Sequence, residues 1–354
     1  MKSAVKNGAA KIMSGQVLSE EAAQAALNEI LSGEVPGAQA AAFLTAIQMR
    51  GIHPSELKGF FRELDGRGIK VDLQEKDMID VCGTGGDDKG TFNISTLTAF
   101  VLAGAGIKVA KHGNSSATSG CGSSDILAFL GIKFSADENK LRGDLTRANI
   151  CYLHAPLFQP GLKQVAALRK EIGFRTFFNL LGPLVNPARP RFRFIGVAEP
   201  AVLRLYRYFF EDGETSFAVV HSRGAGSGDS GGYDEISLTG PFDAATNFGM
   251  ETWYPDDLGF EVAEADELYG GAGLEETAEK FVNILRGNGS DGSDGSNGGA
   301  GAATRTQTDV VIANAAFAMR LVKPELSFAE CRVEAEGSLR SGAAFKSFEY
   351  LCSN

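Results

Sequence analysis

The spacing of apolar residues divides this 354-residue chain into a helical beginning and an alternating remainder. Within the first 70 residues, apolar positions recur at helical intervals in EEAAQAALNEIL (20–31), AQAAAFLTAIQMR (38–50) and PSELKGFFRELDG (54–66). Gly33 and Gly51 follow the first two segments and are expected to end them. These segments predict a helical domain over residues 1–75 that packs against a partner.

From residue 76 the pattern alternates between short strands and helices. The segments are DMIDVC (77–82), STLTAFVLAGAG (95–106), IKVAKHG (107–113) and SSDILAFLG (123–131). The first and third lead into glycines, as buried strands do where they enter ligand-binding loops. The fourth is expected to be a helix capped by Ser123 or Ser124. This alternation predicts an α/β domain with a central, mainly parallel sheet and binding loops at the carboxyl ends of its strands.

A second helical stretch interrupts this α/β pattern. GLKQVAALRKEIG (161–173) and RTFFNLLGPLVNP (175–187) predict helices. FRFIGVAE (192–199) and SFAVVHSR (216–223) then predict further strands, and ISLTGP (236–241) follows them. Helices from about residues 160–190 are therefore expected to join the N-terminal helical domain, and residues 76–159 and 191–354 to form the α/β domain. A flexible Gly/Ser/Asp insertion is expected at 287–301.

Composition narrows the possible functions. The net charge of −10 opposes non-specific binding to nucleic acid, and the chain contains no run of about 18 apolar residues that would span a membrane. Its first residues, MKSAVKNGAAKIMSGQ, lack the apolar core of a signal peptide. Five cysteines are scattered without CxxC spacing, which argues against a disulfide framework or a zinc site. We therefore expect a cytoplasmic protein that binds neither membranes nor nucleic acid.

Glycines and small polar residues follow two of the predicted strands. GTGGD (83–87) is not a Walker A loop, and glycine clusters are often simple turns. NIST (93–96), however, places amide and hydroxyl groups at a helix N-terminus, where anions bind readily. KHGN (111–114) supplies a lysine for phosphate, although His112 alone is typical of a loop histidine bonded to the backbone. The hydroxyl groups that follow, up to residue 119, either bind phosphate oxygens or form a turn. Two such units in succession favour a phosphate site.

Two further motifs suggest a metal site and an acceptor site. Asp234 and Glu235 are adjacent carboxylates and suit Mg²⁺, which prefers oxygen ligands and substrate phosphates. The alternative for this pair is a solvated turn. Arg169 can recognise a planar carboxylate through a bidentate pair, or it can lie on the surface beside Lys170 and Glu171.

The chain resembles the anthranilate phosphoribosyltransferase family over about residues 38–241. The resemblance rests on motifs that occur in this order: GTGGD, NIST, KHGN, HAPLFQP, LRKEIGFRTFFNLLGPLVNP and DEISLTGP. The resemblance implies a small N-terminal helical domain and a larger α/β domain of the nucleoside phosphorylase/phosphoribosyltransferase type. It implies transfer of the phosphoribosyl group from phosphoribosyl pyrophosphate (PRPP) to anthranilate, releasing pyrophosphate, in tryptophan biosynthesis. Mg²⁺ is the implied cofactor, and a homodimer formed through the helical domain is the implied assembly.

Carried over by position, the family's site residues fall on the motifs described above. The resemblance implies that PRPP is bound by Gly83, Thr84, Gly85, Gly86, Asp87, Asn93, Ser95, Thr96, Lys111, Gly113, Thr118 and Ser119. It implies an acceptor tunnel lined by Asn114, Ala155, Pro156, Arg169 and Gly182, with His112 nearby. It assigns magnesium to Ser95, Asp234 and Glu235, and catalytic roles to Asp87, Lys111 and Arg169.

Three stretches depart from the family pattern. The usual KHGNR is KHGN followed by Ser115, and the usual SSKSG is TSGCG (118–122), so two positive charges are absent. The usual HHPAM is FQPGL (158–162), which lacks a histidine. These changes leave open an enzyme of this type with a different small aromatic acceptor. A non-catalytic nucleic-acid-binding relative fits less well with the acidic charge, and phosphorolysis of nucleosides would not need the acidic pair.

Overall fold

The computed structural model describes residues 3–115, 121–224, 232–288 and 303–354. The chain divides into two compact units. The helical unit comprises Met1–Val71 and Ala155–Arg189, and the sheet unit comprises Asp72–His154 and Pro190–Asn354. The chain therefore enters the sheet unit, returns to the helical unit, and then enters the sheet unit again. Within the described ranges, no helix combines the length and the apolar character needed to cross a bilayer.

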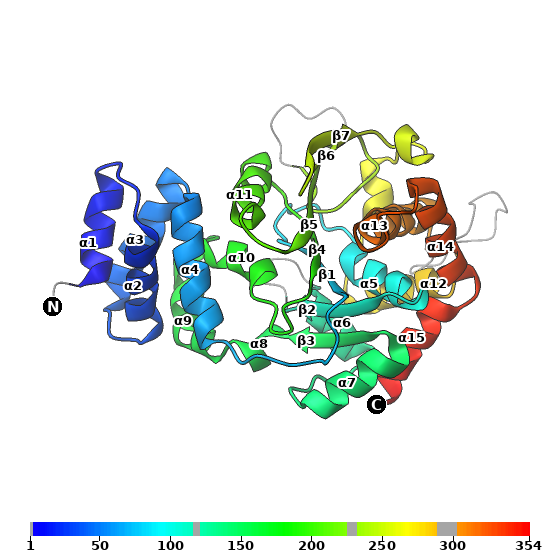
Figure 1. Ribbon diagram of the computed structural model, residues 1–354, viewed down its shortest axis with the longest axis horizontal. Helices are drawn as coiled ribbons and strands as arrows, with labels where there is room; N and C mark the ends of the chain where they lie inside the picture. The colour runs from blue at the N-terminus through cyan, green and yellow to red at the C-terminus, as the bar shows by residue number, and fades with distance from the viewer. Residues whose placement is uncertain (1–2, 116–120, 225–231, 289–302) are drawn as a thin grey trace. The chain divides into compact units, whose positions relative to one another are not determined.

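The helical unit begins with α1 (Ala4–Met13), α2 (Glu20–Leu31), α3 (Gly37–Arg50) and α4 (Pro54–Arg67) (Figure 1). The three helices expected from apolar spacing are confirmed as α2, α3 and α4, and α1 is an additional helix. The return segment adds α8 (Ala155–Phe158), α9 (Lys163–Ile172) and α10 (Phe178–Leu181), with 3₁₀ turns at Pro160–Leu162 and Gly182–Leu184. The helix predicted at 161–173 is confirmed, whereas only a short part of 175–187 is α-helical.

A buried glutamate and a pair of stacked rings hold the helical unit together. Glu56 is fully buried and accepts hydrogen bonds from the backbone N–H groups of Leu18 and His53, both at 2.9 Å. It also forms an ion pair with Arg50. These partners satisfy a buried charge that would otherwise be costly. The Phe60 ring of α4 stacks on Phe177 at 4.0 Å, so α4 packs against the return segment.

The sheet unit contains one seven-stranded sheet in the order β3-β2-β1-β4-β5-β6-β7. The strands are β1 (Met78–Gly83), β2 (Lys108–Gly113), β3 (Ile150–His154), β4 (Phe192–Gly196), β5 (Ser216–Ser222), β6 (Phe242–Thr246) and β7 (Gly249–Trp253). Strands β1 to β5 run parallel, whereas β6 and β7 join antiparallel at one edge. The four predicted strands and the mainly parallel α/β fold are confirmed. The segment 236–241 forms no strand.

Helices cover both faces of this sheet (Figure 1). They are α5 (Ile94–Gly104), α6 (Ser123–Phe129), α7 (Glu138–Ala148), α11 (Pro200–Phe210), α12 (Leu274–Leu285), α13 (Arg305–Val322), α14 (Phe328–Arg340) and α15 (Ala343–Ser353). On one face, Phe317 of α13 lies 6.2 Å from Phe194 of β4. Phe194 pairs with Ala218 in the register, so Phe217 points to the other face, where its ring lies 5.1 Å from that of Phe210 of α11.

The start of α6 differs from the expectation. The helix begins at Ser123 with Gly122 as its N-cap, so the predicted capping by Ser123 or Ser124 is wrong. Asp125 instead accepts a hydrogen bond from the Gly122 N–H at 2.9 Å. A carboxylate three residues into the helix therefore satisfies the backbone at its start.

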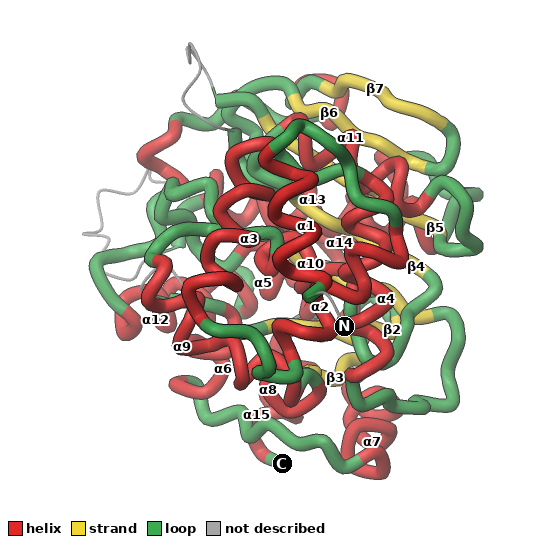
Figure 2. The backbone as a smooth tube through the Cα atoms, turned by 90° about the vertical axis from the view of Figure 1, so that its left-hand side faces the viewer, coloured by secondary structure: helices red, strands yellow, loops and turns green. Residues whose placement is uncertain are grey.

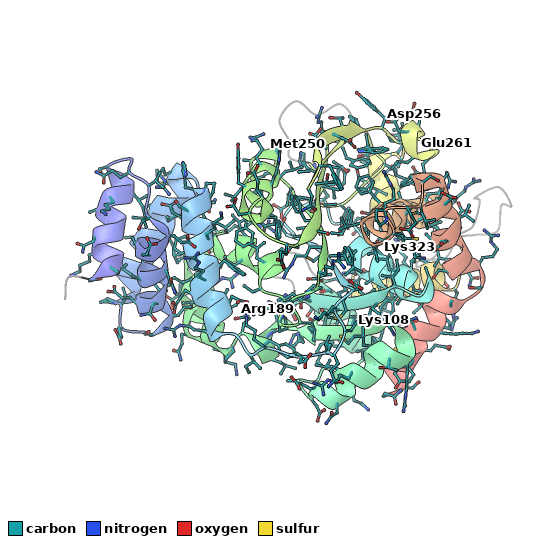
Figure 3. All side chains as sticks on the ribbon, viewed as in Figure 1. Lys108, Arg189, Met250, Asp256, Glu261 and Lys323 are labelled. Atoms are coloured by element: carbon teal, nitrogen blue, oxygen red, sulfur yellow. The ribbon has the colours of Figure 1, made fainter. Side chains whose placement is uncertain are left out.

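The two edges of the sheet differ in character. Figure 2 shows the strands in yellow, from β3 at the lower edge to β7 at the upper edge. On β7, Met250 is 44% exposed (Figure 3), and Phe248 in the preceding turn is 98% exposed. By contrast, all residues of β3 except the last are buried. The hairpin of β6 and β7 therefore forms the solvent-exposed edge of the sheet.

The carboxyl ends of the parallel strands meet along one side of the sheet. Gly83 of β1 pairs with Gly196 of β4, and Gly113 of β2 pairs with His154 of β3. The loops that leave these strands therefore emerge together, which is where parallel α/β sheets bind their ligands.

Candidate active site

The loop that leaves β1 packs directly against Asp234. The Gly85 N–H donates a hydrogen bond to Asp234 Oδ2 at 2.6 Å, between residues 149 positions apart. A Cβ atom at Gly83 would lie 2.3 Å from the same oxygen, and one at Gly196 would lie 1.6 Å from the Asp234 carbonyl oxygen. Only glycine fits at these two strand ends, because each touches the aspartate. Part of the GTGGD loop thus packs closely against a carboxylate of the same chain.

The segment that carries Asp234 and Glu235 is fixed from β5 and α13. Ser222 Oγ of β5 donates to the Glu235 carbonyl oxygen at 2.7 Å. Asn314 of α13 accepts from the Ile236 N–H at 3.0 Å and donates to the Ile236 carbonyl oxygen at 2.8 Å. Asp234 and Glu235 are only 7% and 6% exposed. The alternative of a solvated turn is therefore wrong.

Lys111 lies beside this carboxylate pair. Its side chain is buried, and Nζ donates to the Val81 carbonyl oxygen at 2.7 Å and to Ser95 Oγ at 3.4 Å. The Ser95 hydroxyl also hydrogen-bonds Glu235, so lysine, serine and glutamate form one group at the carboxyl ends of β1 and β2. Burial lowers the pKa of Lys111.

The environment of the acidic side chains in this group disfavours their charged forms. Burial raises the pKa of Asp234 to about 7, and the charge of Asp87 adds to the effect. Burial also raises the pKa of Glu235 well above its usual range, with the charge of Asp234 as the second cause. Asp87 Oδ2 and Glu235 Oε2 are buried and accept no hydrogen bond from the described residues. Buried acidic oxygens of this kind are stabilised by a nearby cation.

These oxygens fit Mg²⁺ as the cation. The described residues include no group of three or more His, Cys, Asp or Glu side chains that would hold a metal without other ligands. Mg²⁺ usually takes one or two carboxylates and completes its coordination with water and substrate phosphates. Glu235 and Asp234, with the Ser95 hydroxyl beside them, match this incomplete donor set.

The start of α5 lies after the glycine loop. Asn93 is the N-cap residue, but its side chain makes no capping hydrogen bond and donates to the Cys121 carbonyl oxygen at 3.3 Å instead. Thr96 is buried, and its Oγ1 has no hydrogen-bond partner within the described part of the chain. Thr84 is bound through its N–H to the Gly196 carbonyl oxygen at 2.9 Å. The start of α5 thus keeps a buried hydroxyl group beside the loop.

The KHGN motif forms the end of β2. The His112 N–H donates to Asp80 Oδ1 at 3.1 Å, and its side chain points to the opposite face of the sheet from Lys111, because neighbours in a strand alternate. Asn114 is exposed, and its Oδ1 accepts from the Ser115 N–H at 2.8 Å. Thr118 and Ser119, together with most of the predicted insertion at 287–301, lie outside the described residues.

The predicted acceptor residues of the helical unit lie on its return segment. Ala155 and Pro156 are the first residues of α8, and Gly182 begins a 3₁₀ turn. The Arg169 guanidinium of α9 lies 5.4 Å from the centre of the Phe178 ring, and burial lowers its pKa. Arg169 is therefore partly buried against an aromatic ring, unlike an ordinary surface arginine.

Comparison with known proteins covers nearly the whole chain. A family model described as "Glycosyl transferase family, a/b domain" matches residues 75–345, and one described as "Glycosyl transferase family, helical bundle domain" matches residues 9–68. The anthranilate phosphoribosyltransferase of Cytophaga hutchinsonii is 44% identical over 332 residues, which cover 94% of this chain and 95% of that protein. The enzyme of the same name from Bacteroides thetaiotaomicron is 43% identical over 334 residues, which cover 94% of each chain.

The chain belongs to the anthranilate phosphoribosyltransferase family.

Solved structures of anthranilate phosphoribosyltransferases share its fold. That from Thermus thermophilus aligns with a TM-score of 0.84 at 32% identity and covers 99% of this chain and 98% of its own. That from Saccharomyces cerevisiae, in complex with PRPP and Mg, aligns with a TM-score of 0.86 at 25% identity and covers 100% of this chain and 98% of its own.

The family motifs identify the acidic pair but not the residues that support it. Gly196, Ser222 and Asn314 fix the Asp234–Glu235 segment, and none was a candidate in the sequence. The available signal was Asn314, an amide within the apolar run VVIANAAFA of α13. A polar side chain in such a run needs buried partners, and in this anthranilate phosphoribosyltransferase family member they are backbone groups of Ile236.

Proposed function

We propose that this protein transfers the phosphoribosyl group of PRPP to the amine of anthranilate and releases pyrophosphate. The observation that carries the proposal is the buried group of Lys111, Ser95 and Glu235 beside Asp234, at the carboxyl ends of the parallel strands. Relatives at 44% and 43% identity carry the name of this activity.

The chemistry requires stabilisation of a leaving group rather than a strong base. The nitrogen of anthranilate attacks C1 of the ribose while the bond from C1 to the pyrophosphate oxygen breaks, and the nitrogen then releases one proton. Mg²⁺, when bound, neutralises charge on the departing pyrophosphate. Asp234 and Glu235 would hold the ion, with Ser95 beside them, and Lys111 adds a fixed positive charge for the phosphates. An aniline nitrogen is neutral at pH 7, so His112 is not assigned as a base.

The remaining binding roles form part of the same proposal. Gly83, Asp87 and Thr96 surround the phosphates, where Thr96 Oγ1 and Asp87 Oδ2 are buried oxygens that make no hydrogen bond to any described residue. Arg169 binds the carboxylate of anthranilate, because a planar guanidinium pairs with a carboxylate through two parallel hydrogen bonds. Asn114 is assigned to the acceptor site.

A homodimer formed through the helical unit is also proposed. Met13 near the end of α1 is 73% exposed, and Met49 near the end of α3 is 85% exposed. Apolar side chains of this size are available to a second copy of the chain. Met49→Lys is expected to shift the species seen in sedimentation velocity towards a monomer. A monomer at all concentrations of the unmodified protein would refute this assembly.

The activity is tested by mixing protein, PRPP, Mg²⁺ and anthranilate and following the loss of anthranilate fluorescence. Decay that requires all four components supports the proposal, and no decay at high protein concentration refutes it. Aminobenzoates with the carboxylate in another position serve as alternative acceptors. Release of pyrophosphate with one of these, but not with anthranilate, would refute the acceptor while retaining a phosphoribosyltransferase.

A further inference from the structure

Three hydroxyl groups meet at the carboxyl ends of β2 and β3. The Tyr152 hydroxyl lies 2.9 Å from Ser123 Oγ and 2.8 Å from Ser124 Oγ. Ser123 Oγ donates to the Asn114 carbonyl oxygen at 3.2 Å, and Ser124 Oγ lies 2.8 Å from His154 Nδ1. These contacts join side chains of β3 and α6 to the residue that follows β2.

Only one arrangement of protons satisfies all four contacts. The Asn114 carbonyl can only accept, so Ser123 must donate to it. Ser123 then accepts from Tyr152, and Tyr152 in turn accepts from Ser124, because each hydroxyl carries one proton. Ser124 can therefore only accept from His154, whose Nδ1 must carry a proton. The result is a directed chain of hydrogen bonds from His154 through three hydroxyl groups to the Asn114 carbonyl oxygen.

The surroundings keep this chain in place. Tyr152 is 4% exposed and Ser124 is 2% exposed, and the ring of Phe134 stacks on His154 at 4.6 Å. A Cβ atom at Gly113 would lie 2.1 Å from the Tyr152 hydroxyl and 2.6 Å from Ser123 Oγ. The strand end therefore approaches the hydroxyl groups as closely as a glycine allows. The Ser124 N–H also donates to the Asn114 carbonyl oxygen, at 3.2 Å.

We propose that Tyr152, Ser123, Ser124 and His154 are positioning residues that fix the backbone of Asn114 for acceptor binding. The consequence for the acceptor rests on the proposed function, in which Asn114 lines the acceptor site. None of the four is assigned contact with the reacting atoms. Their effect is to hold the backbone from which the Asn114 side chain extends, so that less of this segment must be ordered when the acceptor arrives.

The first test reads the proton position on His154 by long-range ¹H–¹⁵N NMR correlation at pH 8. Burial lowers the pKa of His154, partly offset by the charge of Asp125, so the neutral ring is observed at this pH. The chain contains four histidines, and His154→Gln assigns the signal. The expected tautomer carries its proton on Nδ1. In Tyr152→Phe the Ser124 hydroxyl loses its acceptor and can donate to Nδ1, so the tautomer protonated on Nε2 should increase. A wild-type ring protonated on Nε2, or a tautomer unchanged in Tyr152→Phe, would overturn the directed chain.

The second test separates positioning from stability by kinetics. Tyr152→Phe keeps the ring and removes one hydroxyl group, so KM for anthranilate should rise about fivefold to tenfold while KM for PRPP and kcat stay within about twofold. Tyr206→Phe, at another buried tyrosine of the sheet unit, is the matched control and should leave both KM values unchanged. Ser123→Ala should reproduce the rise in KM, and Ser123→Thr should restore the wild-type value.

The two tests fail in distinguishable ways. An unchanged KM for anthranilate in both Tyr152→Phe and Ser123→Ala, measured on an active wild-type protein, would overturn the positioning role. A wild-type protein that does not consume anthranilate would instead refute the proposed function. The NMR result alone then decides whether the directed chain of hydrogen bonds exists.

Discussion

Adding one methyl group at Gly83 should disable the acidic pair without changing any charged residue. The Cβ atom of Gly83→Ala would lie 2.3 Å from Asp234 Oδ2 and 3.0 Å from its Cγ. The aspartate backbone cannot retreat, because its carbonyl oxygen already touches Gly196. The carboxylate must therefore rotate, and its 2.6 Å hydrogen bond from the Gly85 N–H is lost.

Two terms set the expected size of the effect. A hydrogen bond to a charged group is worth about 1.5–3 kcal/mol, which corresponds to a fall of about 10- to 150-fold in Mg²⁺-dependent kcat/KM if the rotated carboxylate no longer binds the ion. Overpacking of a buried site costs about 1–3 kcal/mol in the free energy of unfolding. Activity and stability should therefore both fall.

The assay is turnover of anthranilate across a Mg²⁺ titration, together with urea denaturation. Gly143→Ala is the matched control, because a Cβ atom at this position in α7 meets no atom of the described residues within 4 Å. It should retain full activity and gain up to about 1 kcal/mol of stability from the helix propensity of alanine. Wild-type Mg²⁺ dependence and turnover in Gly83→Ala would refute the reasoning that ties the glycine to the acidic pair.

The acidic pair, the acceptor arginine and the core of the helical unit give three further expectations. Asp234→Asn combined with Glu235→Gln should abolish Mg²⁺-dependent turnover, yet maintain the melting temperature without Mg²⁺ because burial already favours the neutral carboxyl groups that the amides resemble; full activity would show the pair to be dispensable. Arg169→Lys should raise KM for anthranilate about tenfold or more, with KM for PRPP unchanged, because lysine cannot form the bidentate pair; an unchanged anthranilate KM would contradict carboxylate recognition. Glu56→Ala should lower the free energy of unfolding in urea by about 3–5 kcal/mol because Arg50 loses its buried partner, and a loss below about 1 kcal/mol would contradict this role.

Local patterns were sufficient for most of the fold. The strands β1, β2, β4 and β5 are short β-branched or aromatic runs next to glycines, so their sequences agree with their buried positions. Helix α1 was not predicted, because AVKNGAAKIM interrupts its apolar face with Gly8 and buries only small or isolated apolar residues. Strands β6 and β7 were not predicted either, because β7 is an exposed edge strand whose residues show no strong apolar signal.

The motifs of the site were predictable from the sequence, but the contacts between their residues were not. The acidic pair was found because adjacent carboxylates in a family motif stand out, whereas their burial depends on Asn314, which lies in another helix 78 positions from Ile236. The resemblance assigns the glycines of GTGGD to PRPP, and the structure shows that the Gly85 N–H donates a hydrogen bond to Asp234. Contacts between residues this far apart in sequence depend on tertiary packing, which local periodicity does not encode.

Because the chain returns to the helical unit, two side chains that pack together there are synthesised at different times. Phe60 on α4 emerges from the ribosome early, but Phe177, the ring that stacks on it, is made only after β1, β2 and β3. A nascent chain ending at Val71 therefore exposes an apolar surface that the finished protein covers, and exposed apolar surface of this kind favours aggregation. The helical unit can therefore be completed only after the first three strands of the sheet unit have been synthesised, although its own first four helices precede them in the chain.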